Sequence, residues 1–432
     1  MPRFRRCLAL AVTSFLGLTL QLTAAESDKS AGDKGKIAEA AAADWPWWRG
    51  PQRNGIAAAD QTPPVEFSDS KNVRWAAPVS GRGHGSATVV GKKVFLATAD
   101  EEQQTQSVLC FDRQTGKTLW NTEVHKGHFV KGGHKKSSQA SSTPACDGER
   151  IFINFVNQDA VYTTALSVDG KQLWQTRISD YVVHQGFGSS PAIYGPLVII
   201  MADSKVGGAI AGVDRATGEI VWRQERPKLP NYPSPSILTI GGRDQVLLTG
   251  CDLVTSFDPL TGKKIWETAG ATTECVTTTV TDGKRIFTTG GYPKNHIAAM
   301  LADGSGKIDW ENNVRVYVPS MLIRDDRLYC VTDAGVAMCR DSTTGKELFN
   351  LRLGGTFSAS PVMVGDNLYA VNETAGTFVF KITPDAFEKL AENQLGEECL
   401  ATPSICGGQI FLRVASQVDG KRLETLYCLE QK

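Results

Sequence analysis

Short runs of alternating apolar and polar residues recur along the chain, and each leads into a turn rich in Asp and Gly. The clearest copy is Phe111–Trp120 (FDRQTGKTLW). Related segments end at Trp174, Trp222 and Trp266, and looser copies end at Trp310 and Phe349. A period of two predicts β-strands. In D-x-x-T-G-K the Asp carboxylate can accept backbone N–H groups and the Gly can adopt a positive φ, which predicts a tight turn before the last strand of each unit. The Trp is expected to pack against the neighbouring unit.

A second signature precedes each of these segments. It is a small-residue step, often Ser-Pro or Thr-Pro, followed by a short apolar run, a Gly or Asp turn and an alternating run. The step occurs eight times, at Ala87, Pro144, Pro191, Pro235, Thr279, Met321, Pro361 and Pro403. Repeats of roughly 40–50 residues with several short strands each are typical of propeller blades. We therefore predict an all-β, eight-bladed β-propeller with four-stranded blades.

The two ends of the repeat region predict how the ring closes. The eighth unit stops after its third strand, at LETLYCLEQK. Before the first unit, residues 72–79 (NVRWAAPV) form an orphan strand carrying Trp75. Pairing this N-terminal strand into the last blade would close the ring and remove its exposed edges. The propeller is predicted to occupy residues 65–432 as one domain, and a closed ring needs no partner, so a monomer is expected.

The N-terminal region has a different composition. Arg3, Arg5 and Arg6 precede an apolar run at residues 7–22, and small residues follow up to Ala25. This pattern predicts a signal peptide at residues 1–25, cleaved near Ala25, and a secreted or periplasmic protein with no membrane span in the mature chain. Residues 26–43 are charged and Ala-rich and predict a flexible spacer, whereas residues 44–64 predict a Trp- and Pro-rich strap over one propeller face.

Charge and cysteine content narrow the function classes. The chain has 46 Lys and Arg against 46 Asp and Glu, which gives no argument for a nucleic-acid partner. Ten Cys occur without a C-x-x-C pair. Three of them, Cys110, Cys339 and Cys428, share a column of small residues and are expected to be packed in the core. A two-residue turn at Ala334-Gly335 would place Cys330 opposite Cys339, within bridging distance, so a disulfide is the alternative for that pair.

The Ser-Pro step followed by D-x-x-T-G-K-x-L-W resembles the pyrroloquinoline-quinone (PQQ) repeat. This repeat occurs in quinoprotein alcohol dehydrogenases and in the outer-membrane assembly propeller of Gram-negative bacteria. Residues 45–55 (WPWWRGPQRNG) after a secretory segment are similar to the start of secreted PQQ-like propellers of planctomycete-type bacteria. The resemblance covers nearly all of residues 75–430 and implies a fold, but it does not define a reaction.

Two functions of different classes follow from this resemblance. The favoured one is a non-catalytic scaffold that binds a protein partner or a small polar or glycan ligand. The alternative is a quinoprotein oxidoreductase, which would hold PQQ and Ca²⁺ with Asp, Asn and Glu beside an aromatic floor. The methanol-oxidising members also use a disulfide between adjacent cysteines, and this sequence has no Cys-Cys pair. No cofactor and no catalytic residue are therefore expected.

The loops that join each blade to the next are predicted to gather at one mouth of the channel and to form the binding site. The candidate ligand- or partner-binding residues in them are Arg82, His84, Lys136, Gln139, His184, Phe187, Tyr232, Glu274, Tyr317, Phe357 and Glu398. A rim with both signs of charge suits a polar ligand. Recognition of a polysaccharide or cell surface is a further alternative, and it would need Phe187, Tyr232 and Tyr317 in one cleft. His125, His128 and His134 lie in one long loop, but the lysines around them disfavour a dication, so no metal site is expected.

Overall fold

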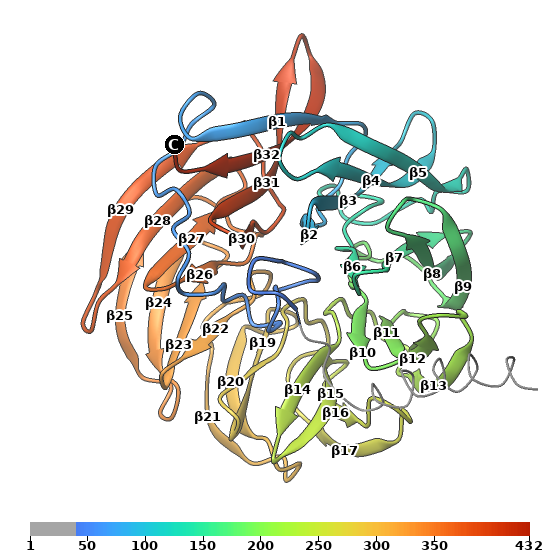
Figure 1. Ribbon diagram of the computed structural model, residues 1–432. Coiled ribbons are helices and arrows are strands. Elements are labelled where there is room, and N and C mark those ends of the chain that lie inside the picture. The colour runs from blue at the N-terminus through green and yellow to red at the C-terminus, as the bar shows by residue number, and fades with distance from the viewer. Residues whose placement is uncertain (1–39) are drawn as a thin grey trace, which may run out of the picture.

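The computed structural model describes residues 40–432, and within this range it contains strands and turns but no helix. Eight sheets of four antiparallel strands are arranged in a ring around a central axis, as Figure 1 shows. The predicted all-β, eight-bladed propeller is therefore confirmed. The predicted signal peptide and most of the predicted spacer lie outside the described residues. Within residues 40–432 no helix is long and apolar enough to cross a membrane.

Each blade runs from an inner strand to an outer strand in chain order. Blade 1 contains β2 (Thr88–Val90), β3 (Lys93–Asp100), β4 (Thr105–Asp112) and β5 (Thr118–Lys126), and blade 2 contains β6 (Ala145–Cys146), β7 (Arg150–Asn157), β8 (Ala160–Ser167) and β9 (Gln172–Asp180). Blade 3 contains β10 (Ala192–Tyr194), β11 (Leu197–Ala202), β12 (Gly208–Asp214) and β13 (Ile220–Arg226). Blade 4 contains β14 (Ser236–Ile240), β15 (Arg243–Gly250), β16 (Leu253–Phe257) and β17 (Lys264–Ala269).

The remaining blades follow the same order, and the last one takes its outer strand from the N-terminal side. Blade 5 contains β18 (Val280–Thr281), β19 (Arg285–Gly290), β20 (His296–Leu301) and β21 (Ile308–Asn312), and blade 6 contains β22 (Leu322–Arg324), β23 (Arg327–Val331), β24 (Val336–Asp341) and β25 (Glu347–Arg352). Blade 7 contains β26 (Val362–Val364), β27 (Asn367–Val371), β28 (Gly376–Ile382) and β29 (Phe387–Gln394). Blade 8 contains β30 (Ser404–Cys406), β31 (Gln409–Val418), β32 (Lys421–Glu430) and β1 (Val73–Val79). Since β1 pairs with β32, the predicted closure by the N-terminal strand is confirmed.

The small-residue step has a structural role around the channel. The Ser or Thr before six of the eight inner strands accepts the backbone N–H of its counterpart in the preceding blade, over 2.9–3.0 Å. Six such bonds run from Ser86 to Thr143, Thr143 to Ser190, Ser190 to Ser234, Thr278 to Ser320, Ser320 to Ser360, and Ser360 to Thr402. These bonds join neighbouring blades and put a ring of hydroxyl-bearing residues on the channel wall.

The outer Trp residues join the blades at the rim. Asp112 accepts the N–H groups of Gln114 and Thr115, and this turn brings Gly116, with a φ of 72°, onto the indole of Trp75. The Trp75 indole N–H donates to the carbonyl of Arg113 over 2.9 Å. The same Trp–Gly contact recurs at Trp120, Trp174, Trp222, Trp266 and Trp310 with Gly170, Gly218, Gly262, Gly304 and Gly345.

This packing explains the column of small residues. Cys110 lies opposite Trp120 and Cys428 lies opposite Trp75 in the sheet ladders, so a larger side chain there would meet the indole. All nine cysteines among the described residues are buried and free. Burial raises the pKa of the Cys110 thiol to about 12 and that of Cys339 to about 11.

The Cys330–Cys339 disulfide weighed from the sequence is wrong. In the ladder Cys339 faces Tyr329, whereas Cys330 faces Met338. The Thr332 N–H bonds the Val336 carbonyl, so the turn contains three residues rather than two. One extra turn residue shifts the register by one, and a shift of one residue turns the two sulfurs to opposite faces of the sheet.

Candidate functional site

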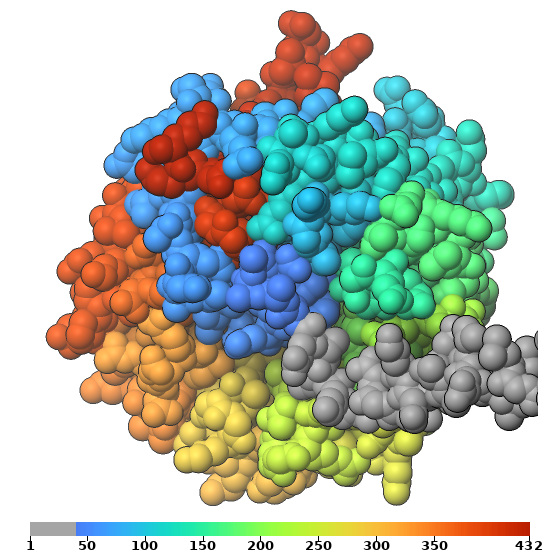
Figure 2. All heavy atoms as spheres, in the orientation of Figure 1, coloured from blue at the N-terminus to red at the C-terminus, as the bar shows by residue number. Residues whose placement is uncertain are grey.

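The N-terminal strap (residues 44–64) lies across one end of the channel. Trp45 exchanges two backbone hydrogen bonds with Val89 in blade 1, and the Ala57 N–H donates to Met363 in blade 7. Between them Arg53 reaches the carbonyl of Ile193 in blade 3. Figure 2 shows these N-terminal residues filling the centre of the face in view.

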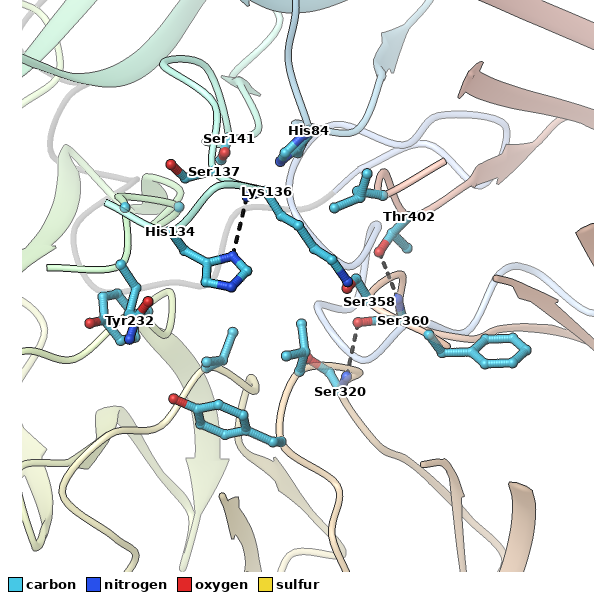
Figure 3. A pocket seen from close by; sticks show the side chains of 18 of the residues that line it. His84, His134, Lys136, Ser137, Ser141, Tyr232, Ser320, Ser358, Ser360 and Thr402 are labelled. Carbon is cyan, nitrogen blue, oxygen red and sulfur yellow. Dashed lines mark hydrogen bonds between the residues drawn. The ribbon is translucent and has the colours of Figure 1, made fainter. Parts of the chain in front are cut away.

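A cavity of about 610 Å³ occupies the other end of the channel (Figure 3). Its walls come mostly from the loops that precede the inner strands, whereas the strap contacts the inner strands themselves and the turns that follow them. Because the inner strands run in the same direction around a propeller, these two sets of residues mark opposite ends of the channel. The cavity size is within the usual range for a ligand pocket, about 300–1,000 Å³.

Half-buried aromatic side chains form a large part of this cavity. Trp48 of the strap lines it, and its indole N–H donates to Thr278 Oγ1 over 2.7 Å. Phe187, Tyr232 and Tyr317 line it from three different blades, so the three aromatic residues named from the sequence do lie in one cleft. Burial raises the pKa of both tyrosines, which keeps their hydroxyls neutral.

An ion pair crosses the mouth of the cavity. Lys136, in the long loop between β5 and β6, reaches the carboxylate of Glu373 in blade 7. Figure 3 shows the Lys136 side chain extending over the cavity. Ser358 Oγ donates to the same carboxylate over 2.7 Å, and the backbone N–H of Lys136 donates to His134 Nδ1 over 3.2 Å. Glu373 is thus held by both a cation and a hydroxyl.

The other carboxylates near the cavity are also engaged. Glu274 lies 3.3 Å from His184 Nε2 and accepts the Tyr317 hydroxyl over 3.3 Å. Asp333 accepts the backbone N–H of Tyr317 over 2.7 Å, and burial raises the pKa of Asp333. These contacts fix the acids to the protein walls.

His84 is a half-buried imidazole on the cavity wall, and its Nε2 is enclosed. Burial, together with the nearby charges of Arg82, Arg413 and Arg422, lowers the pKa of His84 to about 3. Its Nε2 has no hydrogen-bond partner within the described part of the chain. At neutral pH His84 is therefore an uncharged group whose Nε2 is enclosed and unsatisfied, which costs folding free energy.

Of the residues predicted to face the mouth, six line the cavity: His84, Lys136, Phe187, Tyr232, Tyr317 and Phe357. Phe357 is only 1% exposed and packs on Phe378, so its ring belongs mainly to the core. The other five residues are not lining residues of the cavity and contact other parts of the protein. Arg82 donates to the Lys136 carbonyl, Gln139 donates to the Val130 carbonyl, His184 pairs with Glu274, and Glu398 pairs with Arg422.

Sequence reasoning missed Trp48, Asp333 and Glu373 as cavity residues. Asp333 and Glu373 lie in turns between the second and third strands of their blades. Since strand direction alternates within a blade, these turns share a face with the loops between blades. That rule could have identified both acids from the strand pattern, whereas nothing in the sequence places Trp48 within the channel.

Calcium-held PQQ does not match the donor set of this cavity. Ca²⁺ needs six to eight oxygen ligands, several of them carboxylate oxygens. Glu274, Asp333 and Glu373 each have their own protein partners, and no group of three or more His, Cys, Asp or Glu in residues 40–432 converges on one point. Trp48 supplies an aromatic surface, but the residues present do not form a calcium cradle beside it.

A family model described as outer membrane protein assembly factor BamB matches residues 104–348 and, in a second match, residues 293–383. Together the two matches cover well over half of the chain. The chain therefore belongs to this family of PQQ-repeat propellers, as its repeats had indicated.

Curated relatives of two kinds are similar to the chain. The outer membrane protein assembly factor BamB of Burkholderia pseudomallei is 28% identical over 214 residues, which cover 48% of this chain and 49% of that protein. A polyvinylalcohol dehydrogenase of Sphingopyxis sp. is 24% identical over 218 residues, which cover 47% of this chain and 31% of that protein. The chain thus matches about half of the first relative's length and about a third of the second's.

Solved structures similar to the chain also include these two kinds, a BamB protein and dehydrogenases. BamB from Moraxella catarrhalis superposes with a TM-score of 0.58 at 13% identity, covering 82% of this chain and 99% of that one. A europium-containing methanol dehydrogenase superposes with a TM-score of 0.63 at 12% identity, covering 90% of this chain and 92% of that one. At such identities the likeness shows the fold alone, and both scaffolds and dehydrogenases share it.

Proposed function

We propose that this protein is a non-catalytic binding scaffold that holds a small polar ligand in the cavity at the mouth of its channel. The observation that carries the proposal is the cavity wall, where Trp48, Tyr232 and Tyr317 stand beside the ring of Ser and Thr residues. Aromatic faces pack against the apolar faces of a ligand, and a few placed polar groups fix its orientation.

The state of the titratable groups argues for binding rather than chemistry. A general base has to reach the proton that it removes, within hydrogen-bond distance. Glu373, Glu274 and Asp333 are all bound to the protein, and His84 titrates near pH 3, well below the range of a base at neutral pH. The alternative, a quinoprotein oxidoreductase, would require these contacts to rearrange around calcium.

We also propose a secreted or periplasmic location, because the N-terminal pattern reads as a signal peptide and one relative is an outer membrane protein assembly factor. That relative's name also makes a protein segment an alternative occupant of the cavity.

A thermal-shift and calorimetric screen tests the proposal. The screen contains neutral and acidic oligosaccharides and short peptides, and at least one class is expected to raise the melting temperature. Trp48→Ala should weaken the binding of that ligand at least about tenfold, because it removes the aromatic surface. Tyr292→Ala is the matched control, since Tyr292 is 56% exposed and does not line the cavity. Equal binding by wild type and Trp48→Ala would contradict the proposal.

A further inference from the structure

Two guanidinium groups lie buried on the channel axis without a carboxylate. Arg49 is 1% exposed and Arg53 is 7% exposed. Arg49 donates to the carbonyls of Asn54, Ser320 and Met321, and Arg53 donates to Ile193 and stacks over Trp47 at 4.3 Å. Neither forms an ion pair with any acid of the described chain.

Burial lowers the pKa of Arg49 to about 9 and that of Arg53 to about 10, so both remain protonated at neutral pH. A buried charge without a counter-ion is unfavourable, and it attracts an anion in the nearest accessible space. Arg49 does not line the cavity itself, but it donates over 3.5 Å to the carbonyl of Ser320, which does, so its charge lies directly behind the cavity wall.

Two further cations stand at the mouth of the cavity. Arg315 lies over the Tyr317 ring at 5.1 Å and donates only to neutral oxygens, those of Gly291 and Asn295. Lys136 is paired with Glu373, but its side chain is 45% exposed. An ammonium group has three N–H donors, so Lys136 can bind a second carboxylate while Glu373 stays in place.

The Glu373 contacts show how a carboxylate is held here. One oxygen meets the Lys136 ammonium and the other accepts the Ser358 hydroxyl. The protein's own carboxylate thus demonstrates that a cation and a hydroxyl at this mouth are spaced for one carboxyl group. Below it, the hydroxyl ring and the aromatic surfaces suit a ligand that has both hydroxyl groups and apolar ring faces.

We propose that the ligand is a sugar acid, whose carboxylate binds at Lys136 and Arg315 above the buried Arg49 while its rings pack against Trp48 and Tyr232. This inference rests on the proposed function, and it adds the charge and class of the ligand.

The test uses the full chain and two probes, tri-galacturonic acid and its trimethyl ester, which share the same sugar rings and differ in whether each carboxyl is charged or methylated. In calorimetry at low salt the acid should bind at least about tenfold more tightly than the ester, and added salt should reduce that advantage. Lys136→Met should remove most of the advantage. Lys135→Met is the matched control, because Lys135 is the exposed neighbour that does not line the cavity.

The outcomes separate this inference from the proposed function. If the ester binds as tightly as the acid, the sugar-acid assignment is wrong while the binding scaffold stands. If an acidic peptide binds with the same dependence on Lys136 and the trisaccharide does not, the ligand class is wrong. If the acid is preferred but Lys135→Met and Lys136→Met weaken it equally, the carboxylate site is wrong. Failure of every class in the wider screen, by contrast, counts against the scaffold itself.

Discussion

The Trp–Gly contact between blades predicts a large penalty for adding one methyl group at Gly116. Gly116 has a φ of 72°, and a Cβ there would lie 2.6 Å from Cδ2 of Trp75, on the strand that closes the ring. The left-handed backbone alone costs an Ala residue about 1–2 kcal/mol. The overlap with the indole adds about 1–3 kcal/mol, because β1 cannot move away without breaking its pairing with β32. Gly116→Ala should therefore lower the free energy of unfolding by roughly 2–5 kcal/mol.

The matched control lies in the same blade. Gly91 has a φ of 56°, and a Cβ there would meet no atom within 4 Å, so Gly91→Ala should show only the backbone cost. Urea unfolding followed by Trp fluorescence measures both variants. A double-mutant cycle with Trp75→Val should bring the cost of Gly116→Ala down to that of Gly91→Ala. Equal costs for the two Ala variants in the wild-type background would refute the packing argument.

Three further outcomes follow from buried groups. Arg226→Met should cost about 3–5 kcal/mol because it leaves the carboxylate of Asp203 buried and unpaired, and adding Asp203→Asn should recover part of this loss in the same urea titration. The native protein should show no thiol reactive with Ellman's reagent among its buried cysteines, and denatured protein without reductant should show every one of them; a deficit of two would restore the bridge between Cys330 and Cys339. Because the pKa of His84 falls from 6.5 to about 3 on folding, the unfolded state binds the extra proton between these values, so stability is lost as pH drops below about 6.5. His84→Gln should lose less stability than wild type between pH 6.5 and 5, and an identical pH profile would contradict the assigned burial.

The repeat made the fold predictable, because most blades form the tight turn before the outer strand, and the Trp contact to the neighbouring blade, with the same residue types. The Trp at the end of most units, the Gly four residues before it and the small residue opposite it recur at a fixed spacing, so period and closure could be derived from the chain. The turn after Cys330 shows the limit of this reasoning. Ala334-Gly335 matches a two-residue hairpin, but Asp333 joins the turn, and a single extra residue reverses which face each sulfur occupies.

The cavity was only partly predictable, for a different reason. Its residues come from loops far apart in sequence, and the pair Lys136–Glu373 spans 237 positions. The spacing of the blades predicts which loops share a face, and Phe187, Tyr232 and Tyr317 from three of those loops line the cavity. It does not predict which charged side chains meet across the channel, nor that the strap brings Trp48 and two unpaired guanidinium groups to the axis.

The central claim is that the cavity binds a ligand without serving as a quinoprotein active site. Calorimetric titration of the protein with PQQ, in the presence and absence of Ca²⁺, tests this claim most directly. PQQ is itself a carboxylate, so weak binding alone agrees with the cations at the mouth. The account predicts that calcium leaves any such binding unchanged, because the acids are held by the protein. Calcium-dependent, one-to-one binding at micromolar affinity or tighter, with alcohol oxidation in the presence of an artificial electron acceptor, would contradict it.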